Sequence, residues 1–151
     1  MTSPVPSSIR EYDVRTRSTD IFGRVLVSVR DHHYIIDGPI QNQCPGEEVT
    51  PAEAFLGAVA SCGVELIQVI AKDEGIPLAR VQAHIYGLVD RGNQARENVT
   101  TFNQVRLKFT LGGTDAARAG ALIAGFQRRC PLYGTVSVAC ADVKVDYSVE
   151  A

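Results

Sequence analysis

Alternating apolar and polar residues predict strands in the first third of the chain. Val25, Val27 and Val29 recur at every second position, and a similar pattern begins at Tyr12. A period of two is typical of a strand with one buried face. The segment Asp37-Gly38-Pro39 follows and predicts a turn into a loop.

The longest apolar segment predicts a helix from Pro51 to about Asp73. Thr50 can cap this helix, proline suits its first position, and Glu53 completes a capping box. Nearly all sides of the segment are apolar, which indicates burial on most sides, within one chain or against a second subunit. Gly75 is expected to end the helix.

The second half combines further strands with a second helix. Strand patterns cover residues 81–89 and 105–111, and an apolar helical stripe follows. A residue before proline is disfavoured in the helical region, so Cys130 should lie at a helix end or kink. Thr135 to Ala139 and Val143 to Val149 are expected to be the last two strands. Strands and helices occur in blocks, which favours an α+β class with antiparallel sheet. We expect residues 1–151 to form one domain.

Composition narrows the classes of partner. The 151 residues carry a net charge of −2 with 21% charged residues, so we expect no basic face for nucleic acid or anionic lipid. Met1 to Pro6 lacks the features of a signal peptide, and we expect no stretch to reach the roughly 18 apolar residues of a membrane span. Four cysteines without an export signal indicate cytosolic thiols. We therefore expect a cytoplasmic protein without a membrane partner.

Two of these cysteines lie on apolar helical stripes. Cys62 shares its stripe with Phe55, Val59 and Leu66, and Cys130 follows Phe126 by four residues. Free cysteine is often a small core residue, so the spacing allows two inert thiols. It also allows a redox pair, which requires Cα atoms within about 7 Å.

Longer motifs resemble a known family. These are Pro51-x-Glu-x-Phe-Leu-x-Ala-Val-Ala-Ser-Cys62, then a strand ending at Asp90, then the segment from Phe102 to Gly112, then a helix ending in Cys130-Pro131. In this order, over roughly residues 10–149, they resemble the OsmC/Ohr family (osmotically inducible protein C and organic hydroperoxide resistance protein).

The resemblance implies a fold and a chemistry. It implies antiparallel sheets wrapped around central helices in an intertwined homodimer, and a thiol peroxidase that needs no metal or organic cofactor. Cys62 would attack an organic hydroperoxide and become a sulfenic acid, and Cys130 would resolve it as a disulfide. A dithiol reductant such as a lipoylated protein would reopen the bridge.

The resemblance also implies an arginine, held by a glutamate, that activates the attacking thiol. Ala52 stands where much of the family has that glutamate, and Glu53 follows one residue later. At about 100° per residue, Glu53 lies on the helix face opposite Cys62, and its capping role already accounts for it. Arg17 and Arg24 flank the first turn and are the candidate arginines, although both also fit a solvated strand.

Other functions remain open from the sequence. The same fold could bind a small hydrophobic ligand with its cysteines as packing, or it could sense oxidants without turnover. Cys44 is expected to be incidental and Cys140 to pack within a strand. The cysteine and histidine spacing does not support a zinc site.

Overall fold

The computed structural model describes residues 8–151, and the expectation about a signal peptide at Met1 to Pro6 lies outside them. The chain forms two compact units, Met1–Ala54 and Phe55–Ala151. Each has its own sheet.

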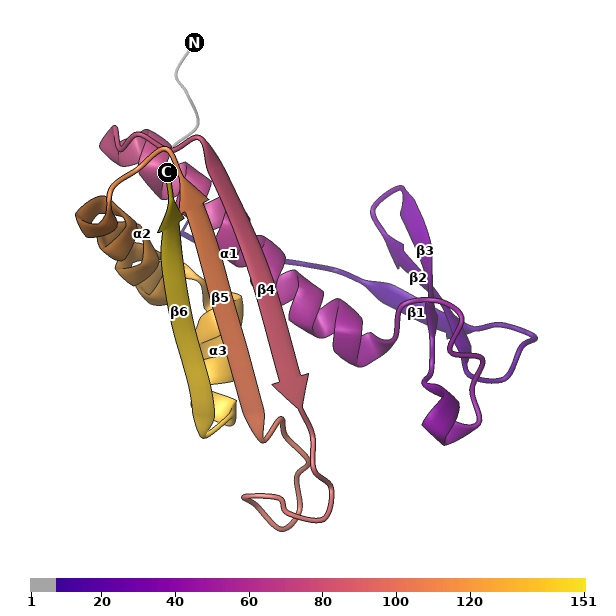
Figure 1. The fold of residues 1–151 in the computed structure, drawn as a ribbon. Helices are drawn as coiled ribbons and strands as arrows, with labels where there is room; N and C mark the ends of the chain where they lie inside the picture. The colour runs from indigo at the N-terminus through magenta and orange to yellow at the C-terminus, as the bar shows by residue number, and fades with distance from the viewer. Residues whose placement is uncertain (1–7) are drawn as a thin grey trace. The chain divides into compact units, whose positions relative to one another are not determined.

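The N-terminal unit contains a three-stranded antiparallel sheet (Figure 1). Its strands are β1 (Arg15–Ser18), β2 (Arg24–Val29) and β3 (His32–Asp37), followed by a short 3-10 helix, η1 (Ile40–Asn42). The register pairs Val25 with Ile36 and Val27 with Tyr34, so the predicted alternation places apolar residues on one face. β1 begins at Arg15, three residues later than the pattern beginning at Tyr12 predicted.

The predicted long helix is confirmed as α1 (Pro51–Glu74). Its start is a capping box, because Thr50 Oγ1 accepts from the N–H of Glu53 and Glu53 Oε2 accepts from the N–H of Thr50. Gly75 follows the last residue at φ +65°, a left-handed conformation that favours glycine and ends the helix as predicted.

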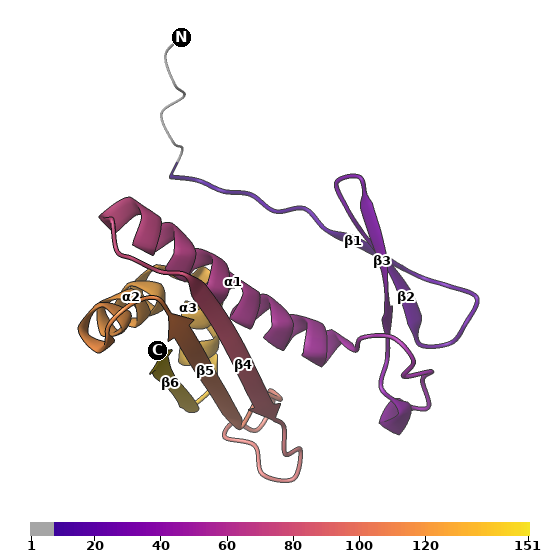
Figure 2. The same cartoon turned by 45° about the horizontal axis from the view of Figure 1, so that its top comes forward.

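The C-terminal unit packs helices on one face of a second sheet (Figures 1 and 2). The sheet has the order β4-β5-β6, with β4 (Arg80–Leu88), β5 (Gln104–Gly112) and β6 (Asp142–Glu150). Between β5 and β6 lie α2 (Ala116–Arg129) and α3 (Pro131–Ala139). Leu107, Phe109 and Leu111 point from one face of β5 into a core shared with α1 and α2. This core holds the helices that carry Cys62 and Cys130.

Two expectations for the end of the chain are wrong. Thr135 to Ala139 lies in α3 and not in a strand. The β-branched residues of this segment favour a strand, but Pro131 at the helix start and packing of Val136 on the core override that preference.

The sheet is also not purely antiparallel, because β6 pairs with β5 in parallel. The chain leaves β5, passes through α2 and α3, and returns to enter β6 in the same direction. Parallel neighbours need such a crossover, and α2 and α3 supply it.

The α1 helix is more apolar than expected. By length and composition it would suffice to cross a membrane, with mean hydropathy 1.8 over its most apolar 18 residues, so the expectation that no segment reaches this threshold is wrong. A core helix of a soluble protein can also meet these criteria of length and hydropathy. Only 28% of that stretch is buried within the chain, which leaves much apolar surface uncovered.

Candidate functional site: two facing thiols

The structure brings the sulfur atoms of Cys62 and Cys130 to 3.1 Å from one another. Cys62 lies in the middle of α1, and Cys130 lies between α2 and α3. Both cysteines are free thiols. A disulfide has an S–S distance of about 2.05 Å, so a shift of about 1 Å separates this dithiol from a bridge.

Gly63 lets α1 approach the aromatic rings of Phe109 on β5 and Phe126 on α2. A Cβ added to Gly63 would lie 2.5 Å from the ring of Phe109 and 3.2 Å from the ring of Phe126. These rings pack edge to face, with centroids 5.1 Å apart. The residue after Cys62 must therefore be small for α1 to lie against this aromatic layer.

The predicted boundary at Cys130 is confirmed and has a clear geometry. Cys130 is in an extended conformation at φ −80° and ψ 114°, ending α2 and capping α3. Its sulfur accepts a hydrogen bond from the backbone N–H of Tyr133 at 3.3 Å. The proline that follows forces this break, which turns the buried thiol toward α1.

Burial controls the ionisation of Cys62. Its pKa is raised to about 12, first by burial, then by the hydrogen bond to Cys130 and the charges of Cys130 and Glu65. The thiolate is the nucleophilic form of cysteine, so reaction of Cys62 at neutral pH calls for a nearby cation.

One of the two candidate arginines is held by carboxylates in the N-terminal unit. Arg24 donates to both oxygens of Asp37, at 2.7 and 2.8 Å, and to Glu47 Oε2 at 2.8 Å. Asp37 is fully buried and also accepts from the backbone N–H groups of Glu47 and Glu48. This network could not be predicted from the sequence, because the strand register that sets Asp37 opposite Arg24 has no local signal.

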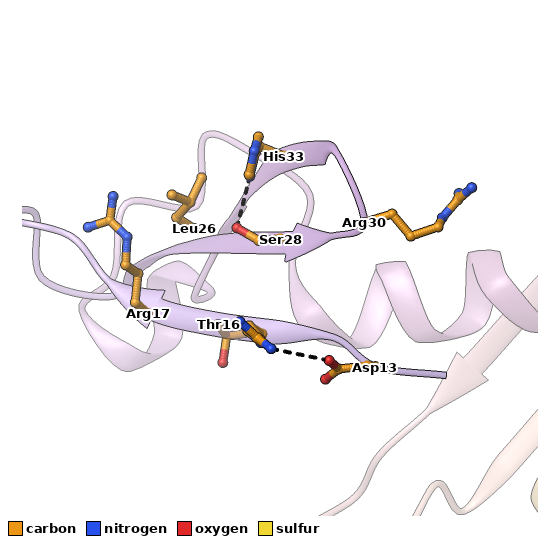
Figure 3. A pocket seen from close by; sticks show the side chains of 8 residues that line it. Asp13, Thr16, Arg17, Leu26, Ser28, Arg30 and His33 are labelled. Carbon is orange, nitrogen blue, oxygen red and sulfur yellow. Dashed lines mark hydrogen bonds and ion pairs between the residues drawn. The ribbon is translucent and has the colours of Figure 1, made fainter. Parts of the chain in front are cut away.

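The other candidate, Arg17, is exposed and lines a cavity of about 590 Å³ in the same unit (Figure 3). Arg15 and Arg30 also line it, as does Asp13, which forms an ion pair with Arg15 at 3.5 Å. The guanidinium groups of Arg17 and Arg30 point in different directions in this view. The roles of Arg17 and Arg24 toward Cys62 stay predictions.

Glu53 performs the capping role that its position predicts. Its pKa is lowered, first by the backbone N–H of Thr50 and then by the hydroxyl of the same residue. Both bonds occupy Oε2. A catalytic role for Glu53 stays a prediction.

The remaining cysteines, Cys44 and Cys140, each have other surroundings. Cys44 packs in the N-terminal unit between Gly23 and Gly38, where any added Cβ would collide with its sulfur. Cys140 is buried, but it follows the end of α3 and is not part of a strand. Within residues 8–151, no group of three or more His, Cys, Asp or Glu residues could hold a metal ion.

Comparison with known proteins supports one family. A family model described as OsmC-like protein matches residues 44–146. No curated protein matches the chain.

Solved structures share the fold at low identity. An organic hydroperoxide resistance protein OsmC from Legionella pneumophila is 20% identical, with a TM-score of 0.75 over 95% of this chain and 100% of that one. An organic hydroperoxide resistance protein from Elizabethkingia anophelis is 13% identical, with a TM-score of 0.77 over 96% and 100%. An OsmC-like protein from Mycoplasma pneumoniae is 15% identical, with a TM-score of 0.75 over 93% and 96%.

Proposed function

Because the chain belongs to the OsmC-like protein family, we propose that it is a thiol peroxidase that reduces organic hydroperoxides through Cys62 and Cys130. The observation that carries the proposal is the 3.1 Å distance between the two sulfur atoms. Two of the structural neighbours are named organic hydroperoxide resistance proteins, which supports the substrate class.

The proposed reaction has three balanced steps. The Cys62 thiolate attacks the distal peroxide oxygen, the O–O bond breaks, and Cys62 becomes a sulfenic acid. The oxygen that carries the alkyl group takes up a proton and leaves as an alcohol. Cys130 then attacks the sulfenic acid, which forms the S–S bond and releases water. A dithiol reductant, such as a lipoylated protein, reduces the disulfide by exchange and restores both thiols.

The position of Cys130 suits the second step. The N–H of Tyr133 at the start of α3 already contacts its sulfur. Backbone N–H groups at a helix start stabilise negative charge, so this contact supports the developing thiolate as Cys130 attacks. The sulfur needs to move by about 1 Å only, without unfolding either helix.

We further propose that the protein acts as an intertwined homodimer. The uncovered apolar surface of α1 supports this, because large exposed apolar patches mark sites of association. We keep Arg17, Arg24 and Glu53 as the candidate groups that activate Cys62. Arg24 is held by the carboxylates of Asp37 and Glu47, which agrees with the expectation of an arginine held by a glutamate and favours Arg24 as the cation.

A second function, binding of a small hydrophobic ligand without turnover, is favoured by Ala52, which stands where much of the family has the glutamate that holds the activating arginine. A thiol with a pKa near 12 is almost entirely protonated at neutral pH and reacts slowly with peroxide. In this alternative both cysteines serve as packing.

Thiol titration separates the two functions. We would count free thiols before and after one equivalent of tert-butyl hydroperoxide, and expect a loss of two per chain that Cys62→Ser abolishes. Cys130→Ser should leave a sulfenic acid that dimedone labels at Cys62. Continuous peroxide consumption with a lipoyl reductant would establish turnover.

Two outcomes would contradict the proposal. Unchanged thiols together with unconsumed peroxide would favour ligand binding. Loss of two thiols without turnover under any dithiol reductant would favour a redox sensor.

A further inference from the structure

A different thiol, Cys140, lies in the wall of an apolar cavity within the C-terminal unit. The cavity measures about 250 Å³, and neither Cys62 nor Cys130 lines it. Its lining is almost wholly apolar and includes Phe55, Phe102, Thr135, Val136, Ala139 and Cys140. A concave apolar site of this kind takes an apolar ligand group.

Aromatic stacking shapes one wall of the cavity. The rings of Phe55 and Phe102 are nearly parallel, at 10°, with centroids 5.8 Å apart. The last turn of α3 supplies Val136, Ala139 and then Cys140. Because these aromatic and aliphatic side chains line the cavity together, it suits an aliphatic chain better than a polar group.

Arg106, which Asp142 holds in place, lies near the Cys140 thiol. The Cys140 sulfur is 3.8 Å from the carbonyl oxygen of Asp142, and Arg106 donates to that oxygen at 2.9 Å. Arg106 also donates to the Asp142 carboxylate at 2.6 Å. Its pKa is raised, first by this hydrogen bond, with the charge of Cys140 among the smaller causes.

We propose that this cavity binds the aliphatic chain of an α,β-unsaturated carbonyl compound and that Cys140 adds to it covalently. The apolar lining of the cavity selects the aliphatic chain of the ligand, and the Cys140 thiol is the nucleophile that reacts with it. The inference is independent of the Cys62–Cys130 pair and of the peroxidase cycle.

The addition needs no further reagent. The Cys140 sulfur forms a bond to the β-carbon, and the π electron pair between the α- and β-carbons forms a double bond between the α-carbon and the carbonyl carbon. The π pair of the carbonyl group moves onto its oxygen, which gives an enolate. The thiol proton finally reaches the α-carbon. Arg106 supplies positive charge near the reacting groups as the negative charge develops.

Addition also fits the surroundings of Cys140 better than oxidation does. Within residues 8–151, the Cys140 sulfur contacts the carbonyl oxygen of Asp142 and forms no disulfide. A sulfenic acid at this position would therefore lack a neighbouring thiol to resolve it.

The test compares two electrophiles that differ only in chain length. In a Cys44→Ser/Cys62→Ser/Cys130→Ser protein, we would measure labelling by N-octylmaleimide and N-ethylmaleimide, each divided by its rate with N-acetylcysteine. We expect the octyl reagent to react with Cys140 at least about tenfold faster, because its chain enters the cavity. A protein that keeps only Cys44 is the matched control and should show a ratio near one.

Filling the cavity should remove the preference. In the same background, Ala139→Leu should bring the ratio close to one while changing the N-ethylmaleimide rate little. Arg106→Gln should slow both reagents and leave the ratio unchanged, and Arg106→Lys should restore part of the rate. Incubation with trans-2-octenal, followed by borohydride reduction and peptide mapping, should place the adduct on Cys140.

A ratio near one in the folded Cys140-only protein would overturn the inference, as would octenal adducts on other residues alone. If the triple variant does not fold, peptide mapping of the wild-type protein gives the same ratio at Cys140 against Cys44. Because the test protein lacks Cys62 and Cys130, its outcome does not depend on peroxidase activity.

Discussion

At the scale of single residues, the chemistry of Cys62 depends on what surrounds one sulfur atom. Burial, the thiol of Cys130 and the charge of Glu65 all raise its pKa. Glu65 lies one helical turn further along α1 and is exposed, so its influence acts partly through solvent. It is the one carboxylate among the causes that raise this pKa.

We predict that Glu65→Gln makes Cys62 more reactive. Removing the negative charge lowers the pKa of Cys62, and below that pKa a lower value gives more thiolate. The rate of iodoacetamide labelling at Cys62, followed at pH 8 by peptide mapping, should rise about twofold. Glu74→Gln, at the end of the same helix, is the control and should leave the rate unchanged. A slower rate in Glu65→Gln would mean that Glu65 holds an activating cation.

A second residue prediction concerns the buried carboxylate of Asp37. Arg24 holds the pKa of Asp37 well below its usual range, so the folded state favours the charged form. The stabilisation is therefore present above the ordinary aspartate pKa of about 3.9 and is lost as the pH falls below it. Asp37→Asn should lower the urea midpoint by about 1 M at pH 7, and this difference from wild type should shrink toward pH 3.

The control for Asp37 is Asp31→Asn, which changes an exposed carboxylate between β2 and β3. It should leave the urea midpoint unchanged at both pH values. An Asp37→Asn effect of equal size at pH 7 and pH 3 would show that charge pairing with Arg24 is not its cause.

At the scale of elements, α1 has one face built for close packing and another that is open. Gly63 faces the rings of Phe109 and Phe126 at distances too short for a Cβ. Gly57, on the same helix, has nothing within 4 Å of the position a Cβ would take. The two glycines therefore separate the effect of packing from that of helix propensity.

We predict opposite effects of alanine at these two positions. Gly63→Ala should destabilise the protein by about 1–3 kcal/mol, because the methyl group forces Phe109 out of place. Gly57→Ala should stabilise it by about 0.5–1 kcal/mol, because alanine loses less backbone entropy in a helix. Urea denaturation of both variants tests this, and equal changes would contradict the close approach at Gly63.

At the scale of the whole molecule, the chain leaves apolar surface on α1 that its own residues do not cover. Most of the apolar 18-residue stretch of this helix is not buried within the chain. Association with a second copy would bury this surface and stabilise both chains by mass action.

We predict that light scattering after size exclusion gives a mass of twice 16.3 kDa. The thermal midpoint should rise with protein concentration, since each chain is stabilised by its partner. A monomer at micromolar concentration, with a midpoint independent of concentration, would contradict the proposed homodimer.

Strong local signals made several elements predictable. Thr50, Pro51 and Glu53 fixed the start of α1 because capping depends on residues close in sequence. Pro131 likewise made Cys130 a helix boundary. The segment 135–139 was predicted wrongly because its β-branched residues favour a strand and only packing of Val136 on the core decides for a helix.

By itself, the sequence determined the ends of α1, the alternation in β2 and β5, and two cysteines on apolar helical stripes. These features depend on residues within a few positions of each other. The tertiary structure alone decided that the sulfur atoms lie 3.1 Å apart, that Asp37 holds Arg24, and that β6 runs parallel to β5. Each of these joins residues from distant parts of the chain, and such contacts are set by how helices and strands pack in three dimensions.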